Sequence, residues 1–404
     1  MRKFLLAGVC ALASMVAFGA TAQEKLGSKP IKVGMISDFS SQFAVYTGLG
    51  SVQAANLAVE DFLKEKPNRK IEIITADHQN KPDIASTTAR QWWETQGVDV
   101  ITELAGSPTA LAVTAIAKEK KKFALVVSAS SSAIAGEQCG PTVIHWPYNT
   151  FVTSGAPIQA MLAQGQDTFY FIAVDTGTGT AVQTDATAVI TAGNGKVVGS
   201  IRHPFGATDF SSFILQAQAS KAKVIALANS GGDTVNTIKA LNEFGLMKTT
   251  KVVALLLNVL DVHAAGLPAT QGIYVADGSY WDLDDQTRAF TKRYMEKIPR
   301  IPNHVQTAMY SAMLQYLRAV DAVDTTDPEA VVAQMYKMTF NDFYAKGGKL
   351  RPDGLMQHDF YLFQVKTPAE SKGPNDYYKV IETIPGAKAF PPLADSKCPM
   401  VKKS

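Results

Sequence analysis

Two short runs of glycine and hydroxyl-bearing residues are the segments best suited to bind a small anion. Residues 106–109 (GSPT) follow the apolar pair Val100-Ile101, and residues 230–234 (SGGDT) follow the similar pair Val224-Ile225. Each run is expected to end a strand and begin a helix, whose first amide groups have no partner within the helix. Such amides favour anions, although βα turns resemble one another by chance and the pattern alone identifies no ligand.

Motifs for enzymatic chemistry and for nucleotide binding are absent from the sequence. It contains no phosphate-binding loop, no G-x-G-x-x-G after a strand, no H-E-x-x-H and no G-x-S-x-G. Residues 175–179 (DTGTG) follow a strand but lack the Lys and Ser/Thr that complete a phosphate loop. Hydroxyl groups at Ser107 and in residues 128–132 (SASSS) have no histidine near them in sequence. An exported hydrolase would need a triad assembled from distant segments, and it remains one alternative.

Composition excludes several further classes of protein. Lys and Arg number 39 and Asp and Glu 36, so the formal charge is +3, which gives no clustered cations for nucleic acid. Three cysteines are too few for a disulfide scaffold or a four-ligand zinc site. No histidine is paired with Cys, Asp or Glu at a spacing typical of metal ligands, so we predict neither a metal nor a cofactor.

The first 22 residues predict a signal peptide. A short basic start, Arg2-Lys3, precedes the apolar run 4–18, and Ala20-Thr21-Ala22 supplies the small residues that signal peptidase needs. The apolar run is shorter than the roughly 20 residues of a membrane span. We therefore expect export to the periplasm and cleavage near Ala22.

The exported chain would keep two cysteines, Cys139 and Cys398. Two thiols in an oxidising compartment usually pair, and this disulfide would tie the proline-rich tail, residues 391–404, to the middle of the chain. The alternative is two unpaired, buried thiols.

Strand and helix patterns alternate in two series, which predicts two α/β lobes with parallel sheets. The first series has strands at 31–37, 71–76, 99–104 and 123–128, with helices between them. The second has strands at 169–174, 196–200, 223–228 and 251–257, with helices at 208–220 and 233–244. A strand at 273–277, a long helix at 304–323 and a strand at 360–365 follow.

Three segments then point to one family. Residues 31–38 (IKVGMISD), 77–82 (DHQNKP) and 310–312 (YSA), in this order and spacing, resemble the branched-chain amino-acid-binding (leucine-binding-like) family of type I periplasmic substrate-binding proteins. The resemblance implies two Rossmann-like lobes joined by three hinge crossovers that close on a ligand. It places lobe 1 at 29–145 plus 278–350, and lobe 2 at 146–277 plus 351–390.

The resemblance also implies where the ligand binds. The ligand carboxylate would be held by Ser107 and by Ser130 and Ser132, through charge-assisted hydrogen bonds. Tyr46, with Phe39 and Phe43, would form an aromatic wall. Ser230 in the second turn is also expected at the site.

Departures from the family pattern argue against an ordinary amino-acid ligand. Thr178 stands where amino-acid binders place an aromatic side chain, and Asn258 stands near the position of the acid that pairs with the ligand ammonium. Asp233 could replace that acid, but we favour its interpretation as a helix N-cap. Because burying an unpaired ammonium is costly, we predict that the ligand is not an ordinary α-amino acid. The subgroup of the family that the chain most resembles binds aromatic or other organic carboxylates, so the resemblance implies a small organic, aromatic carboxylate.

The predicted protein is therefore a monomeric solute receptor of an ABC importer, not an enzyme, with a small carboxylate ligand and an inner-membrane permease as partners. Two alternatives share this fold: an amino-acid or amide binder that uses Asp233 or Asp175 for the cation, and a sensory module that presents its ligand to a receptor.

Overall fold

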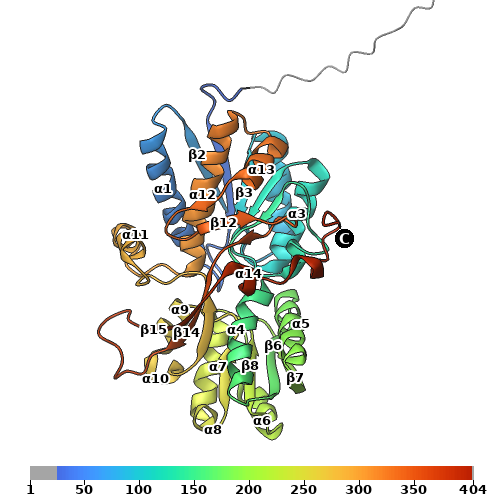
Figure 1. Ribbon diagram of the computed structural model, residues 1–404, viewed down its shortest axis with the longest axis vertical. Helices are drawn as coiled ribbons and strands as arrows, with labels where there is room; N and C mark the ends of the chain where they lie inside the picture. Colours follow the sequence, from blue (N-terminus) through green and yellow to red (C-terminus); the bar gives the residue numbers. More distant parts are fainter. Residues whose placement is uncertain (1–24, 403–404) are drawn as a thin grey trace, which may run out of the picture.

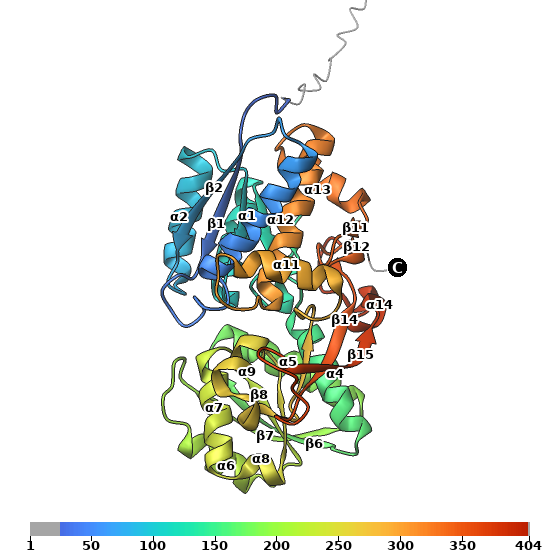
Figure 2. The ribbon, with the colours of Figure 1, turned by 90° about the vertical axis from the view of Figure 1, so that its left-hand side faces the viewer.

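The computed structural model describes residues 25–402 and folds them into two α/β lobes stacked along the long axis (Figures 1 and 2). This confirms the predicted fold class. The predicted signal peptide, residues 1–22, lies outside the described residues. Within 25–402, no helix is both long and apolar enough to cross a membrane, and no group of three or more His, Cys, Asp or Glu side chains could hold a metal ion.

The first lobe is built on a five-stranded parallel sheet in the order β2-β1-β3-β4-β5. Its strands are β1 (Ile31–Ser37), β2 (Ile71–Asp77), β3 (Val100–Glu103), β4 (Phe123–Val126) and β5 (Val143–His145). Helices α2 (Pro82–Thr95) and α3 (Ser107–Lys120) cover one face, and α1 (Gly48–Glu65) and α12 (His304–Val323) cover the other. The carboxyl ends of all five strands therefore face the second lobe.

The second lobe is built on a seven-stranded sheet in the order β15-β14-β10-β9-β8-β6-β7. Five strands are parallel: β6 (Thr168–Val174), β7 (Lys196–His203), β8 (Val224–Ala228), β9 (Lys251–Ala254) and β10 (Tyr274–Asp277). In β6, Phe169 and Phe171 pack under α4 (Thr150–Ala163) and α5 (Gly177–Ala192), and Tyr170 and Ile172 pack on the opposite face. Helices α6 (Ser211–Ala219), α7 (Gly232–Glu243) and α9 (Val259–Ala265) cover that opposite face.

The chain crosses between the lobes at residues 146–149, at 278–284 and at 358–359. Between the last two crossings it forms α11 (Asp285–Met295), α12, α13 (Pro328–Lys337) and a small sheet of β11 (Phe340–Asn341), β12 (Lys346–Leu350) and β13 (Met356–Gln357). All of these pack against the core of the first lobe. Short crossing segments of this kind are where hinge closure of two lobes around a ligand takes place in other proteins.

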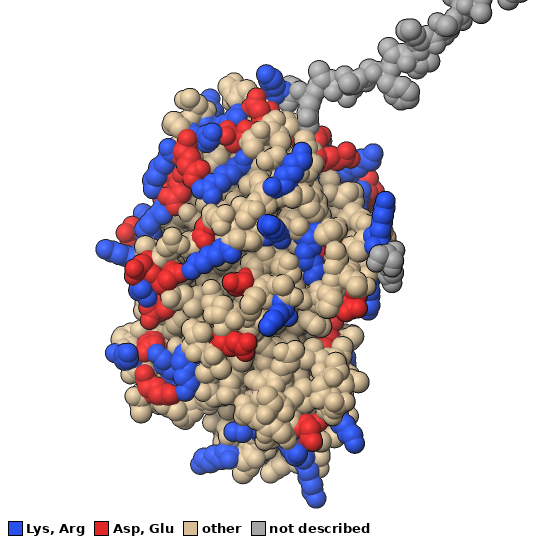
Figure 3. Space-filling model, viewed as in Figure 1, with Lys and Arg blue, Asp and Glu red and all other residues tan. Residues whose placement is uncertain are grey.

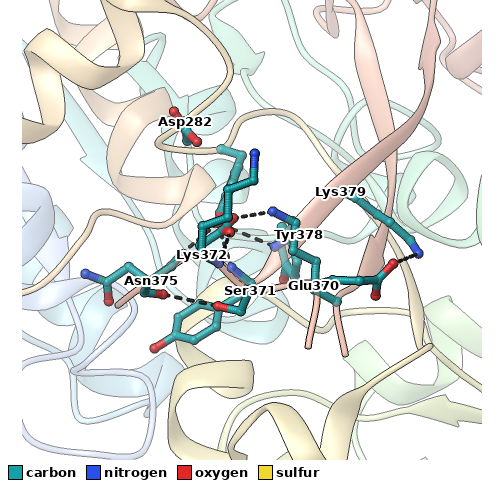
Figure 4. A network of polar contacts seen from close by, with 12 residues as sticks. Asp282, Glu370, Ser371, Lys372, Asn375, Tyr378 and Lys379 are labelled. Atoms are coloured by element: carbon teal, nitrogen blue, oxygen red, sulfur yellow. Dashed lines mark hydrogen bonds and ion pairs between the residues drawn. The ribbon is translucent and has the colours of Figure 1, made fainter. Parts of the chain in front are cut away.

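The loop at 366–377 braces the second crossing. It connects β14 (Phe360–Val365) to β15 (Tyr378–Ile384), both antiparallel to their neighbours. The hydroxyl of Tyr280 and the indole N–H of Trp281 both donate to the carbonyl of Asn375, at 2.7 and 2.9 Å. An ion pair of 2.6 Å between Glu370 and Lys379 holds the base of the loop (Figure 4).

The sequence did not predict β15 or the small sheet. Only the first residue of β15 is fully buried, and its middle carries Lys379 and Glu382 at the sheet edge. The apolar alternation that marks a half-buried strand is therefore missing. Strand β12 contains Gly347 and Gly348, which weaken any strand signal.

Charged side chains of both signs are interspersed over the first lobe on the face drawn in Figure 3. This mixture matches the near-neutral charge balance of the sequence. On that face no extended surface of one sign is visible.

Cys139 and Cys398 form a disulfide across 259 residues of sequence. Phe390 packs into the core of the first lobe, and the hydroxyl of Ser396 hydrogen-bonds Asp353 at 3.2 Å. The predicted pairing is therefore present, and it anchors the tail to the loop after β4.

We predict that breaking this disulfide lowers the free energy of unfolding by about 2–4 kcal/mol, because the cross-link restricts a long loop of the unfolded chain. Urea unfolding would compare the wild type, with and without a reductant, to the double variant Cys139→Ser/Cys398→Ser. The double variant should match the reduced wild type and should not respond to the reductant. Equal stability of the oxidised and reduced wild type would contradict the prediction.

Candidate ligand-binding cleft

A cavity lies between the lobes at the carboxyl ends of both sheets. The first lobe contributes residues that follow β1, β3, β4 and β5 and the start of α12, and the second lobe contributes residues that follow β6, β8 and β9. In open α/β sheets, this edge is the usual place for a ligand. The lining residues are Phe43, Tyr46, Thr47, Ala105, Gly106, Ser107, Ser128, Ser130, Tyr148, Thr153, Thr178, Ser230, Gly231, Leu256, Leu257, Asn258, Ala276, His304 and Val305.

Serine hydroxyls and helix amides form the polar wall of the first lobe. Helix α3 begins at Ser107, and its N-cap Gly106 has a φ of 82° and provides no side-chain cap. A Cβ at position 106 would lie 2.6 Å from Oδ1 of Asn80, so the turn requires glycine. The hydroxyl of Ser107 accepts a hydrogen bond from the amide of Ser131 at 3.2 Å, and so keeps its own hydrogen for a further partner.

Apolar side chains complete the walls. Phe43, Leu256, Leu257 and Val305 face the cavity, which is thus polar on some sides and apolar on others. Phe39 is not among the lining residues, so the predicted aromatic wall contains only Phe43 and Tyr46.

Six of the eight predicted site residues line the cavity. They are Tyr46, Ser107, Ser130, Thr178, Ser230 and Asn258. Their contact with a ligand stays a prediction. Sequence reasoning missed Ser128, Tyr148 and His304, which come from a strand end, a crossing segment and a helix start without a family signature.

A family model described as periplasmic binding protein matches residues 30–374 of the chain. The protein belongs to the periplasmic binding protein family. Members of this family are substrate-binding proteins, not enzymes.

Solved structures and curated relatives agree with this assignment. A periplasmic binding protein from Burkholderia mallei is 44% identical, with a TM-score of 0.90 over 93% of this chain and 100% of that one. A branched chain amino acid ABC transporter periplasmic ligand-binding protein from Burkholderia xenovorans LB400 is 40% identical, with a TM-score of 0.83 over 92% of this chain and 100% of that one. Leu/Ile/Val-binding protein homolog 6 of Brucella melitensis is 28% identical over 224 residues, so the match spans 54% of this chain and about half, 55%, of that relative.

A more distant solved structure has the same fold. An R. palustris solute-binding protein of an ABC transporter, in complex with 4-hydroxybenzoate, is 21% identical, with a TM-score of 0.80 over 88% of this chain and 97% of that one.

Within this periplasmic binding protein, Ser132 does not line the cavity. Its hydroxyl donates to Asp185 of α5 at 2.5 Å, and Thr150 also donates to the same carboxylate oxygen. Ser132 lies on a short 3-10 turn after β4 that directs its side chain across to the second lobe. The structure therefore shows an interlobe contact for Ser132, whereas the sequence predicts a ligand contact.

The predicted role of Asp233 as an N-cap is wrong. The N-cap of α7 is Gly231, with a φ of 64°, and Asp233 lies in the first turn. Its two carboxylate oxygens accept from the amide of Gly206, at 3.1 and 3.2 Å. Burial raises the pKa of Asp233, and the Gly206 amide opposes the rise. Asp233 lines a second cavity, which adjoins the one described above and shares Phe43, Gly106, Thr178 and Ser230 with it.

An acid does follow the fourth strand of the second lobe, three residues beyond Asn258. Asp261 accepts from the Tyr46 hydroxyl at 2.6 Å and from the Asn258 amide at 2.8 Å. Asn258 in turn caps α9, through a bond from the amide of Leu260 to its side chain. Burial raises the pKa of Asp261 to about 7. Asp261 does not line the cavity, and its hydrogen bonds stabilise the cap of α9 and hold the Tyr46 hydroxyl.

A second buried acid lies beneath the polar wall. Glu103 ends β3 with a φ of 76°, in the left-handed region, and is fully buried. Burial raises its pKa to about 7, and the hydroxyls of Ser51 and Ser128 oppose the rise. The charged form of Glu103 is therefore costly in the folded protein.

We predict that Glu103 makes the fold less stable as the pH rises from about 4 to about 7. A raised pKa means that the folded state binds its proton more tightly than the unfolded state, so the cost is absent at low pH and complete above pH 7. The stability of Glu103→Gln relative to the wild type should therefore improve by about 3 kcal/mol between pH 4 and pH 7.5. Urea unfolding at several pH values would measure this change.

The exposed residue Glu137 provides the control, because its carboxylate remains in solvent when the chain folds. The Glu137→Gln variant should keep a constant difference from the wild type over this pH range. A difference for Glu103→Gln that is also constant with pH would refute the prediction.

Proposed function

We propose that this protein is the periplasmic solute-binding component of an ABC importer and that it captures a small aromatic carboxylate between its lobes. Charge-assisted hydrogen bonds from Ser107, Ser130 and the first amides of α3 would hold the carboxylate. Phe43, Tyr46 and Leu257 would cover the apolar part. Because such a ligand touches both lobes only when they are closed, binding would shift the population to the closed state.

One observation carries this choice of ligand: among residues 25–402, no Asp or Glu lines this cavity itself, and Asp233 belongs to the adjoining cavity. The ammonium of an amino acid would be buried there without a carboxylate partner, which is costly. The complex of the R. palustris protein with 4-hydroxybenzoate shows that this fold accommodates such an acid in another protein.

The proposal includes export and a partner. We propose that a signal peptide is cleaved near Ala22, that the protein acts as a monomer in the periplasm, and that an inner-membrane permease receives the ligand. The sensory alternative predicts the same cleft, and the neighbouring genes would distinguish it.

An amino-acid or amide ligand is the second candidate. The 40% identical branched chain amino acid ABC transporter periplasmic ligand-binding protein from Burkholderia xenovorans favours this candidate. Asp233 in the neighbouring cavity would then pair with the ligand cation, after giving up its bonds to Gly206.

We predict that carboxylates without an amine stabilise the refolded, ligand-free protein against heat, and that leucine and glutamate do not. A ligand at 100 times its dissociation constant adds about 2.7 kcal/mol to the free energy of unfolding, enough for a clear shift. The panel would contain benzoates, hydroxycinnamates, aliphatic acids, leucine, glutamate and urea. A shift with amino acids alone would favour the second candidate.

The Ser107→Ala variant should bind the tightest-binding acid of the panel with an affinity about 10- to 100-fold lower, because a hydrogen bond to a charged group is lost. Isothermal titration calorimetry would measure this. Ser212→Ala on the exposed surface of α6 is the matched control and should bind as the wild type does. Equal affinities of the two variants would exclude Ser107 from the site.

A further inference from the structure

His304 provides a second polar group to the same cavity. It is the first residue of α12, it is 8% exposed, and it lines the cavity together with Val305. Its Nδ1 lies in close contact with Oδ1 of Asp277, the last residue of β10. Its Nε2 is buried and has no hydrogen-bond partner within residues 25–402.

The surroundings of His304 fix its orientation. The preceding residue, Asn303, caps α12 by accepting from the amide of Gln306 at 3.0 Å, and its side chain donates to the carbonyl of Tyr46 at 3.0 Å. The ring of Tyr148 meets the imidazole edge-on, with centroids 4.9 Å apart. Asp277 is itself held, because its Oδ1 accepts from the amide of Gly278 at 2.9 Å.

The hydrogen-bonding chemistry of this imidazole favours a ligand group that can both donate and accept a hydrogen bond. With Nδ1 bound to Asp277, Nε2 is an acceptor in the neutral ring and a donor in the protonated ring. A hydroxyl group suits both states. A second carboxylate on the ligand could accept a hydrogen bond only from the protonated ring. A ligand with only a C–H group beside Nε2 would leave this nitrogen buried without a hydrogen-bond partner, which is unfavourable.

His304 and the serine wall come from different elements. Ser107 and Ser130 follow β3 and β4, whereas His304 begins α12 and is anchored to β10, beside the second crossing. A ligand that satisfies both needs a carboxylate and, elsewhere on the molecule, a hydroxyl.

We propose that His304, oriented by Asp277, binds a hydroxyl group of the ligand and thereby makes the cleft selective for hydroxylated organic acids over their unsubstituted analogues. This inference rests on the proposed function. It adds a specificity-determining residue, His304, and a positioning residue, Asp277, to that site.

The test compares benzoate with its 2-, 3- and 4-hydroxy isomers by calorimetry on the refolded protein. At least one isomer should bind the wild type tenfold or more tightly than benzoate, because a site built to hydrogen-bond a hydroxyl rejects the analogue that lacks it. In His304→Leu, the affinities for the hydroxylated acid and for benzoate should differ by no more than about threefold, chiefly because the hydroxylated acid binds more weakly. Asp277→Asn should reduce the ratio partly, and His304→Gln, which keeps a donor and an acceptor, should restore part of it.

Different results overturn different claims. If benzoates bind the wild type but the ratio is near one, or is the same in folded His304→Leu, then the role of His304 is wrong and the proposed carboxylate site stands. If no acid on the panel binds, both proposals fail. Should the variants not fold, ¹⁵N-histidine spectra of the wild type provide the readout. One ring nitrogen should then shift with the hydroxylated acid and not with benzoate, and identical spectra with the two acids would refute the proposal.

Discussion

Two hydrogen bonds from hydroxyls of the first lobe to carboxylates of the second join the lobes on either side of the cleft. Tyr46 donates to Asp261, and Ser132 donates to Asp185. Phe43 and Tyr46 also pack against the core of the second lobe, although both lie on the loop after β1 of the first. These contacts exist only with the lobes together, so they favour closure before any ligand contributes.

Closure also has a cost that opposes these contacts. With the lobes together, Nε2 of His304 is buried without a hydrogen-bond partner among residues 25–402, and Asp261, whose charged form burial disfavours, is buried beside Tyr46 of the other lobe. A ligand whose polar groups pair with those of the cleft removes part of this cost only in the closed state. The differential affinity that hinge closure needs can therefore come from pairing polar groups, in addition to burying apolar surface.

The sequence predicted the positions of the cleft residues better than the directions of their side chains. Ser107 and Ser230 could be placed because strand periodicity and parallel connections bring the turns after β3 and β8 to facing edges. Ser132 could not, because its direction depends on a 3-10 turn and on the distance to α5 in the other lobe. The N-cap assignment of Asp233 failed because Gly231, with its positive φ, is the N-cap of α7, two residues before Asp233.

The pair of His304 and Asp277 shows why such sites escape sequence reasoning. The two residues are separated by a crossing segment and the whole of α11, and nothing in their local sequence marks either one. From the local sequence, Asp277 is only the polar residue at the end of a buried strand, and His304 is only the first residue after the Asn303 cap. The end of β10 and the start of α12 lie side by side only because the chain crosses between the lobes at residues 278–284 and returns through α11. The backbone position of a residue that follows a helix cap is fixed by the cap, so the direction of its side chain is fixed as well. The cap does not restrict which type of residue stands there. The fold therefore fixes the place of this side chain, and its chemistry is free to match the ligand.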